Sequence, residues 1–485
     1  MSERPLPPPD LEPEAALLAR VRAAGQGHVL RFLDALDGAA RDAFLRQLAG
    51  LDWDALPELR RLARGIAEGG ERPGLAPDLA AAETPACETL GGPRATAAAE
   101  AGTRALAAGE CGAILVAGGQ GSRLGCTGPK GIVPVGPLSG RTLFEMLAGK
   151  LVGIARRHGR PVPLAIMTSS ATDDDTRRWL ADHDHAGLDP AQVLVFRQSD
   201  LPALDDREAN LLLDAPGRIA MAPDGHGGML PALERAGGLE WFARHGCRHV
   251  VSFQVDNPLA MPLHPEFLGH HLLAGAEFTT QVVAKREPGE RVGVVVRAGG
   301  RTFVVEYSDL PAALAAERRG DGRLRFHAGS IAVHAFALEF LARAAEAPDP
   351  LPLHLAHKAV PHIDGAGAPV APRTPNAVKF ERFIFDLMPL ARGVVLVEID
   401  AADGFAPLKN PPGAAADTLA HVHAAMDAFA RRLLGRAGVT VAEGGAVELA
   451  PWILDEADVA AVCPPGTHLA APTVVGERRG GPAGD

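Results

Sequence analysis

The segment from Ile114 to Lys130, ILVAGGQGSRLGCTGPK, constrains the fold more than any other part of the chain. It begins as an apolar run typical of a buried strand, and the run leads directly into a glycine-rich loop. Because glycine has no Cβ, this backbone can turn sharply and bring its N–H groups against an anion. Two cations accompany the loop: Arg123 offers planar donors suited to phosphate oxygens, and Lys130 adds a mobile point charge. The segment therefore predicts a cradle for a nucleotide triphosphate.

Two common phosphate-binding loops can be compared with this segment, and neither fits it. A Walker A loop ends in Gly-Lys-Ser/Thr, whereas Lys130 follows Pro129 and precedes Gly131. The dinucleotide fingerprint, counted from Gly119, requires a glycine where Leu124 stands, so a nicotinamide-dependent dehydrogenase is a weak alternative. A glycine turn with a purely structural role is the other alternative, and the two cations beside the loop argue against it.

Composition limits the class of the protein and of its partners. The chain has 485 residues, of which 47% are hydrophobic, enough for two or three domains with a large buried core. Its formal net charge of −11 argues against a nucleic-acid partner. No apolar run is as long as a membrane span, and the first residues lack a signal peptide's apolar core, so we expect no membrane partner. The five cysteines show no paired spacing, which favours a reduced, cytoplasmic setting. The pattern leaves the oligomeric state open.

Apolar spacing divides the chain into three predicted parts. Residues 1–95 are typical of a helical N-terminal region and linker, because apolar residues recur at helical spacing up to about residue 67. Residues 96–390 alternate strands and helices, which favours an α/β fold with a mostly parallel sheet. Residues 391–485 predict a small C-terminal α+β domain. The predicted strands include 114–117, 164–167, 193–196, 219–221, 250–255 and 394–399, and the predicted helices 142–154, 172–182 and 417–434.

Four polar segments accompany these strands. The glycine-rich turn at 222–229 has room to wrap a base or a sugar closely, although it also suits a tight surface turn. Asp256 follows a buried strand, where a carboxylate beside a phosphate site can hold Mg²⁺, although a lone Asp is more often a cap or turn residue. Tyr307, the only tyrosine, follows Glu306, and the pair suits sugar hydroxyls or plain strand-end polarity. Lys409 stands in a proline-constrained loop, where it would clamp a phosphate or simply face solvent.

Together these segments resemble one known family, the eukaryotic-type UDP-N-acetylglucosamine pyrophosphorylases within the wider UDP-sugar pyrophosphorylase group. The resemblance runs from about residue 115 to 410, and ten segments in the family's order make it very specific. It is carried by GGQGSRLG (118–125) with PKG (129–131), FRQSDLPAL (196–204), APDGHGG (222–228), VDN (255–257), RVGVV (291–295), EYSDL (306–310), AGSI (328–331), LPLHLAHK (351–358), NAVKFERFIFD (376–386) and PLKN (407–410).

The resemblance implies a nucleotidyltransferase-type, Rossmann-like core with flanking N- and C-terminal domains. It further implies an enzyme that converts UTP and a sugar 1-phosphate into a UDP-sugar and pyrophosphate, with Mg²⁺. Carried over position by position, it implies triphosphate binding by Gly118, Gly119, Gly121, Arg123 and Lys130, uracil recognition by Gln198 and Gly225, and metal binding by Asp256. It implies a sugar site at His226, Gly293, Glu306, Tyr307 and Ser330, with Lys379 and Lys409 near the phosphates; Arg123, Lys130 and Lys409 would be the catalytic cations.

Two departures from the family's pattern concern the sugar. His226 replaces the asparagine of the family's Gly-Asn-Gly turn, and Ser330 replaces the asparagine of its Ala-Gly-Asn-Ile segment. The Gly-His-Gly form is similar to that of UDP-glucose pyrophosphorylases. A glucose-1-phosphate uridylyltransferase or a broad UDP-sugar pyrophosphorylase is therefore the alternative activity. A UDP-sugar-binding regulatory protein without catalysis is the alternative of another class, and the complete set of cations argues against it.

Overall fold

The computed structural model describes residues 13–67, 77–347 and 351–477, which fall into two compact units. Of these residues, unit 1 holds 13–67, 199–228 and 351–383, and unit 2 holds 77–198, 229–347 and 384–477. The predicted division into 1–95, 96–390 and 391–485 stays a prediction. Of the helices within the described ranges, none combines the length and the apolar character that a membrane crossing requires.

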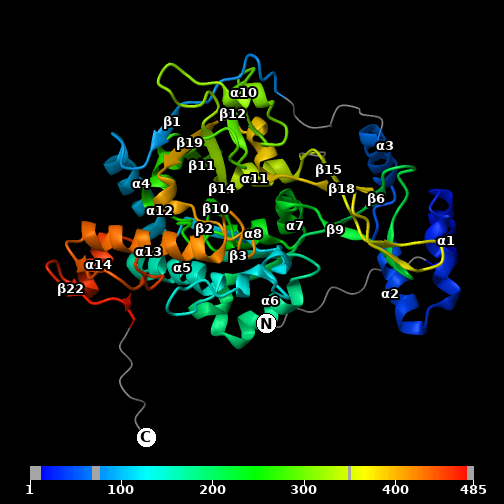
Figure 1. Ribbon diagram of the computed structural model, residues 1–485, viewed down its shortest axis with the longest axis horizontal. Coiled ribbons are helices and arrows are strands. Elements are labelled where there is room, and N and C mark those ends of the chain that lie inside the picture. Colours follow the sequence, from blue (N-terminus) through cyan, green and yellow to red (C-terminus); the bar gives the residue numbers. More distant parts are fainter. Residues whose placement is uncertain (1–12, 68–76, 348–350, 478–485) are drawn as a thin grey trace, which may run out of the picture. The chain divides into compact units, whose positions relative to one another are not determined.

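Unit 2 is built on a ten-stranded sheet, most of whose strands are labelled in Figure 1. Its main path runs β1-β19-β11-β14-β10-β2-β3-β4, and β12 and β13 extend it beside β14. All neighbours on the path are parallel except β14, which is antiparallel to both β10 and β11. The mixed, mostly parallel sheet predicted from the sequence is confirmed. Its strands are β1 (Cys87–Thr89), β2 (Cys111–Val116), β3 (Leu164–Thr168), β4 (Val193–Arg197), β10 (His249–Gln254), β11 (Phe278–Ala284), β12 (Val294–Ala298), β13 (Arg301–Val305), β14 (Ala328–Ala337) and β19 (Val394–Ile399).

Helices connect and cover these strands. The two helices predicted at 142–154 and 172–182 are present as α5 and α6. Thr142 and Glu145 begin α5 with a reciprocal capping box. The helices of the unit are α4 (Ala95–Ala108), α5 (Leu143–His158), α6 (Asp173–Asp182), α7 (Met229–Arg235), α8 (Gly238–Arg244), α9 (Pro265–Leu273), α10 (Ala312–Ala316), α11 (Leu338–Ala345), α12 (Ala401–Gly404), α13 (Leu419–Arg436) and α14 (Glu456–Val462).

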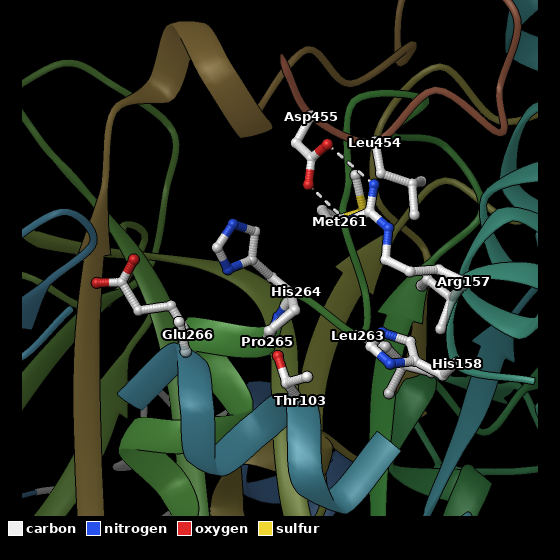
Figure 2. A pocket seen from close by; sticks show the side chains of 12 residues that line it. Thr103, Arg157, His158, Met261, Leu263, His264, Pro265, Glu266, Leu454 and Asp455 are labelled. Carbon is white, nitrogen blue, oxygen red and sulfur yellow. Dashed lines mark hydrogen bonds and ion pairs between the residues drawn. The ribbon is translucent and has the colours of Figure 1, made fainter. Parts of the chain in front are cut away.

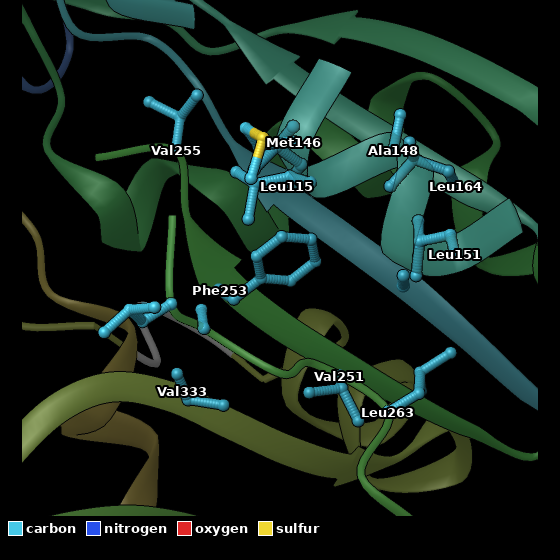
Figure 3. Close-up of a cluster of buried hydrophobic side chains, with 14 of the residues drawn as sticks. Leu115, Met146, Ala148, Leu151, Leu164, Val251, Phe253, Val255, Leu263 and Val333 are labelled. Carbon is cyan, nitrogen blue, oxygen red and sulfur yellow. The ribbon is translucent and has the colours of Figure 1, made fainter. Parts of the chain in front are cut away.

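The main core of unit 2 lies between α5 and the sheet. Figure 3 shows Met146 and Leu151 of α5 meeting Leu115 of β2, Phe253 of β10 and Val333 of β14. Residues of β2 are buried on both faces, as expected for a strand inside a covered parallel sheet. This core holds the strands rigidly, so the loops at their ends have a firm base.

The carboxyl ends of β2, β3, β4 and β10 lie at one edge of the sheet, because these strands are parallel neighbours. The glycine-rich loop follows β2, Gln198 follows β4, and Asp256 follows β10. Open parallel sheets bind ligands at this edge. The topology therefore brings three sequence-predicted segments to the same place.

The C-terminal part of unit 2 combines α13 and α14 with the short strands β20 (Thr440–Val441), β21 (Val447–Leu449), β22 (His468–Leu469) and β23 (Thr473–Val475). They pack around their own apolar cluster, which includes Leu433, Val447 and Ile453. The strand predicted at 394–399 is present as β19, and it pairs in parallel with β11 of the main sheet. The main sheet therefore extends past residue 390.

Unit 1 joins N-terminal helices to two later stretches of chain. Its helices are α1 (Glu14–Ala23), α2 (Gly38–Ala49) and α3 (Leu56–Ala67), which confirms the predicted helical N-terminus. Leu17, Phe44 and Leu59 share a core with Leu204 and Phe380. The strands of the unit are β5 (Asp200–Pro202), β6 (Leu204–Asp205), β7 (Leu213–Ala215), β8 (Arg218–Ile219), β9 (Met221–Pro223), β15 (His354–Lys358), β16 (His362–Ile363), β17 (Pro369–Val370) and β18 (Ala377–Glu381).

The strand predicted at 219–221 is wrong. Ile219 ends β8, Met221 begins β9, and the two strands pair antiparallel with different partners, β7 and β5. Ala220 between them donates its N–H to Leu212 and accepts from Ala203. The apolar run is real, but its buried side chains serve two small ladders of unit 1 and not a strand of the main sheet.

Candidate functional site

The loop after β2 closes on itself. The N–H of Gly121 donates to the carbonyl of Gly128 at 2.9 Å, and the N–H of Lys130 donates to the carbonyl of Gly119 at 3.0 Å. Gly125 and Gly128 have φ of +77° and +100°. Residues with a Cβ rarely adopt such backbone angles, so glycine is needed at both turns. The loop places Arg123 exposed on its outer turn and Lys130, half-buried, on its return to the sheet.

Gly118 and Gln198 meet where β2 and β4 end. A Cβ on Gly118 would lie 2.4 Å from Nε2 of Gln198, so no larger residue fits without displacing that side chain. Ser169 supports the same point by donating its hydroxyl to the carbonyl of Gly118 at 2.8 Å. Gln198 is buried, and its N–H donates to the carbonyl of Thr168 at 3.0 Å. A planar amide is thus fixed beside the first glycine of the loop, a geometry suited to a flat polar ring.

Lys130 and Asp256 form the charged centre of this edge. The Lys130 ammonium lies 3.7 Å from Oδ2 of Asp256, and the side chains are 17% and 19% exposed. The ammonium also donates to the carbonyl of Leu408 at 3.3 Å. The N–H of Leu408 in turn donates to the carbonyl of Asp256 at 2.8 Å. Three segments that are far apart in the sequence therefore converge on one partly open cation and carboxylate.

Asn257 holds the last of these segments. Its side-chain Nδ2 donates to the carbonyl of Gly404 at 2.8 Å, and its Oδ1 accepts from the N–H of Ala406 at 3.0 Å. The loop that carries Lys409 is thereby fixed to the end of β10. The N–H of Lys409 donates to the carbonyl of Asp417 at 2.8 Å, and its ammonium lies 5.8 Å from the centre of the Phe405 ring. Lys409 is thus the next residue after Leu408, whose carbonyl contacts the Lys130 ammonium. Its contact with a phosphate stays a prediction.

A second group of predicted residues gathers around β12 and the start of β14. The N–H of Ser330 donates to the carbonyl of Gly293 at 2.8 Å. A Cβ on Gly293 would lie 3.1 Å from Oε1 of Glu306, so the glycine leaves room for this carboxylate. Tyr307 is 47% exposed and lies on the solvent side of the turn after β13. Gly293, Glu306 and Ser330 are therefore brought together, as a shared binding role requires.

Unit 1 carries the remaining predicted residues, Gly225, His226 and Lys379. The turn at 224–228 packs against Arg382, whose guanidinium contacts both carboxylate oxygens of buried Asp224 at 2.9 and 2.8 Å. A Cβ on Gly225 would lie 2.5 Å from the carbonyl oxygen of Arg382, and φ there is +75°, so glycine is required. Lys379 lies half-buried on β18 of the same unit.

His226 is a neutral histidine on this turn. Its ring stacks on Phe383 with 5.2 Å between centroids and 22° between planes. Burial, helped by the neighbouring His354, lowers the pKa of His226 to about 4. At pH 7 the side chain therefore carries no charge and can offer one donor or one acceptor to a hydroxyl group.

Three residues that contact these segments were not predicted: Ser169, Asn257 as an individual residue, and Lys150, whose ammonium donates to the carbonyl oxygens of Pro258 and Ala260. Ser169 stands directly after β3, and Asn257 follows Asp256 in the turn after β10, so the same strand-end reasoning that found Asp256 would have found them. Lys150 stands alone among apolar residues of α5. A lysine on an apolar helical face is the one signal that marked it.

The pocket in Figure 2 is a different place in unit 2. It is a cavity of about 420 Å³ among α4, α5, α9 and the segment before α14. Arg157 crosses it to Asp455, and His264 and Glu266 face it from the start of α9 (Figure 2). None of the sequence-predicted site residues lines it.

Comparison with known proteins decides the family. The family model described as UTP--glucose-1-phosphate uridylyltransferase matches residues 98–420, which include every sequence-predicted site residue. The chain belongs to this family. A mouse protein named UDP-N-acetylhexosamine pyrophosphorylase-like protein 1 is 36% identical over 93% of this chain and 92% of its own length. UDP-N-acetylglucosamine diphosphorylase 2 of Arabidopsis thaliana is 33% identical over 85% of this chain and 83% of its own length.

A solved structure agrees with the fold of this family member. The uridine diphosphate N-acetylglucosamine pyrophosphorylase from Trypanosoma brucei, crystallised with an inhibitor, matches 96% of this chain and 99% of its own. The TM-score is 0.78 at 26% sequence identity. The resemblance found in the sequence motifs and the nucleotidyltransferase-like fold class are both confirmed. The chain is a uridylyltransferase of the pyrophosphorylase type, and the roles of its single residues stay predictions.

Proposed function

We propose that this protein transfers a uridylyl group from UTP to a sugar 1-phosphate, most readily an N-acetylhexosamine 1-phosphate, and releases pyrophosphate. The contact between Lys130 and Asp256 at the end of the glycine-rich loop carries the proposal. This pair supplies a cation for phosphoryl oxygens and a carboxylate for a metal ion, both at the edge of the sheet where the parallel strands end. The relatives with more than 30% identity that bear N-acetylglucosamine or N-acetylhexosamine names support the choice of sugar.

The reaction asks for alignment and charge stabilisation from the protein. A phosphate oxygen of the sugar 1-phosphate attacks the α-phosphorus of UTP, and the bond from that phosphorus to the bridging oxygen of the leaving pyrophosphate breaks. Because the sugar phosphate is already an anionic nucleophile, no general base or covalent residue is required. Arg123 and Lys130 would stabilise the negative charge that develops on the phosphoryl oxygens. Gln198 would hold the uracil ring at the end of β4, and Gly118, which lies against its side chain, would bind the triphosphate.

A divalent ion fits the chemistry of Asp256. Mg²⁺ is usually bound by one or two carboxylates together with phosphate oxygens and water. Within the described residues no three Asp, Glu, His or Cys side chains form a closed cage, so the ion would be shared with the triphosphate. When bound, Mg²⁺ stabilises charge on the phosphoryl oxygens. Asp256 would hold it and Lys130 would balance the remaining charge.

A panel of sugar 1-phosphates tests the reaction. We expect pyrophosphate release from UTP, Mg²⁺ and N-acetylglucosamine 1-phosphate, with slower release from glucose 1-phosphate. The absence of pyrophosphate with every sugar phosphate, despite measurable UTP binding, would instead identify a UDP-sugar-binding protein without catalysis.

A glucose 1-phosphate activity is the second candidate, and the identities of His226 and Ser330 favour it. If these residues select the sugar, the double variant His226→Asn, Ser330→Asn should shift the kcat/KM ratio toward the N-acetylated substrate. The exposed His245 offers a matched control, because His245→Asn should leave the ratio unchanged. An unchanged ratio in the double variant would show that other residues choose the sugar.

A further inference from the structure

Lys150 is a buried lysine that the proposed reaction does not use. It lies in the middle of α5 and is only 8% exposed. Its ammonium donates to the carbonyl oxygens of Pro258 at 2.6 Å and of Ala260 at 2.7 Å. Burial lowers the pKa of Lys150 to about 7. Burying an ammonium group is costly, so a cation at this point needs a reason beyond filling the core.

The two carbonyl oxygens belong to the turn that carries Asp256. This turn runs from the end of β10 at Gln254 to Ala260, whose N–H donates to the carbonyl of Asn257 at 3.1 Å. Proline has no N–H, so the carbonyl of Pro258 is the only backbone hydrogen-bonding group of that residue. Lys150 donates hydrogen bonds to this carbonyl and to the carbonyl of Ala260, and so holds the turn against α5.

The same helix also supports the loop that carries Lys130. A Cβ on Gly131 would lie only 2.1 Å from Cζ of Phe144, so the first turn of α5 packs tightly under the residue next to Lys130. Phe144 and Lys150 are buried on one helix. One rigid element thus contacts the backbone on both sides of the Lys130–Asp256 contact.

We propose that Lys150 is a positioning residue that holds the Asp256 turn at the correct distance from Lys130, and thereby sets how tightly Mg²⁺–UTP is bound. The inference rests on the proposed function, and it assigns to Lys150 no contact with a substrate. Its role passes through the backbone carbonyls of Pro258 and Ala260. Changes to residues that orient a metal ligand typically cost 10–100-fold in metal affinity or activity.

The test compares three variants of the full chain. Lys150→Met keeps the length and apolar stem but has no donors, Lys150→Arg keeps both the donors and the charge, and Arg156→Met removes an exposed cation from the same helix as a matched control. Calorimetry measures binding of Mg²⁺–UTP, and steady-state assays measure the Mg²⁺ concentration for half-maximal turnover, KM for the sugar phosphate and kcat.

We expect Lys150→Met to weaken Mg²⁺–UTP binding and raise the half-maximal Mg²⁺ concentration by about 10–100-fold. KM for the sugar phosphate should change less than the Mg²⁺ requirement, and Lys150→Arg should restore Mg²⁺–UTP binding to within about threefold of wild type. If Lys150→Met does not fold, Lys150→Gln, whose side chain is shorter and carries no charge, should show a loss in the same direction.

A purely structural lysine would give another result. If Lys150→Met or Lys150→Gln lowers the melting temperature but leaves Mg²⁺–UTP affinity at the level of Arg156→Met, the inference is overturned. The binding data also separate it from the proposed function. A wild-type protein that binds Mg²⁺–UTP without turnover refutes the reaction and still permits the test, whereas a wild type that binds no Mg²⁺–UTP refutes both.

Discussion

The distance between the Lys130 ammonium and the Asp256 carboxylate is near the upper limit for an ion pair. At 3.7 Å, and with both side chains partly exposed, neither group is fully committed to the other. Each can therefore exchange its partner, Lys130 for a phosphate oxygen and Asp256 for a divalent ion. A shorter, fully buried pair would resist that exchange, because removing either charge from its partner would be costly.

The first prediction at this scale concerns Asp256. Asp256→Ala removes the carboxylate proposed to bind Mg²⁺, so turnover that depends on Mg²⁺ should fall by about 10²–10³, as for other electrostatic groups at reacting centres. Turnover measured against Mg²⁺ concentration is the check. Asp174→Ala, which removes an exposed carboxylate from α6, should behave as wild type. Undiminished activity of Asp256→Ala at low Mg²⁺ would exclude Asp256 as the ligand.

Single residues of the candidate site were predictable from the sequence when their chemistry was local. Arg123 and Lys130 stand in one glycine-rich loop, and Asp256 directly follows a strand, so a short window of sequence marks each. Lys150 was not predictable in this way. Its partners Pro258 and Ala260 lie 108 and 110 residues further along the chain, and no local pattern joins them.

At the scale of elements, the crossing of α4 and α9 is set by glycines. A Cβ on Gly102 would lie 1.8 Å from the carbonyl oxygen of Pro265, and one on Gly269 would lie 1.7 Å from that of Ala98. The backbones of the two helices therefore touch, which only residues without a Cβ allow. Because α9 follows the Asp256 turn in the chain, this contact helps to fix where β10 and its turn end.

Gly102→Ala should therefore destabilise the protein. The added methyl group must push the helices apart, and overpacking of this kind costs about 1–3 kcal/mol or more. Chemical denaturation would measure the change in the free energy of unfolding. Gly435→Ala is the matched control, since a Cβ there meets nothing within 4 Å and alanine is the better helix former by up to about 1 kcal/mol. Equal stability of the Gly102 variant and wild type would contradict the described crossing.

Helices and strands were predicted well where the apolar pattern was long. They were missed where the segment is short and its contacts with other parts of the chain determine its structure. The helix α5 was predictable from its apolar period. The helix predicted at 172–182 begins at Asp173, and the Thr172 hydroxyl accepts a hydrogen bond from the N–H of Ser169 and does not cap the helix. The helix α14 (Glu456–Val462) was missed, because a helix of seven residues contains too few turns for a clear period.

At the scale of the whole molecule, buried histidines tie stability to pH. His271 is fully buried, and its Nδ1 lies 2.8 Å from the hydroxyl of Thr279. Burial, with His249 nearby, lowers the pKa of His271 from 6.5 to about 3. Between these pH values His271 is therefore protonated in the unfolded chain and neutral in the folded chain. This residue's contribution to stability is complete above about pH 6.5 and is lost as the pH falls toward 3.

We therefore expect the free energy of unfolding to decrease as the pH is lowered from 7 to 5. His271→Gln should reduce the slope of this pH dependence by up to about 1.4 kcal/mol per pH unit. Urea denaturation at several pH values would measure both slopes. His245→Gln, which replaces an exposed histidine, is the comparison variant. A variant slope equal to that of wild type would show that His271 accepts a proton without unfolding.

The assembly of unit 1 was beyond prediction from the sequence. Its three stretches are brought together by pairings such as Ala377 of β18 with Asp205 of β6, which join residues far apart in the chain. Short strands of two to five residues carry little periodicity of their own. The alternating strands and helices of unit 2 were predictable, because each crossover is local and long enough to show its pattern.

The measurement that tests the central claim most directly is the turnover of Lys130→Ala beside its affinity for UTP. The account predicts that kcat for pyrophosphate release falls by about 10²–10³, because charge on the reacting phosphoryl group loses its cation. UTP should still bind, since the glycine-rich loop and Gln198 remain. Near-normal turnover of the variant with UTP and a sugar 1-phosphate would contradict the account.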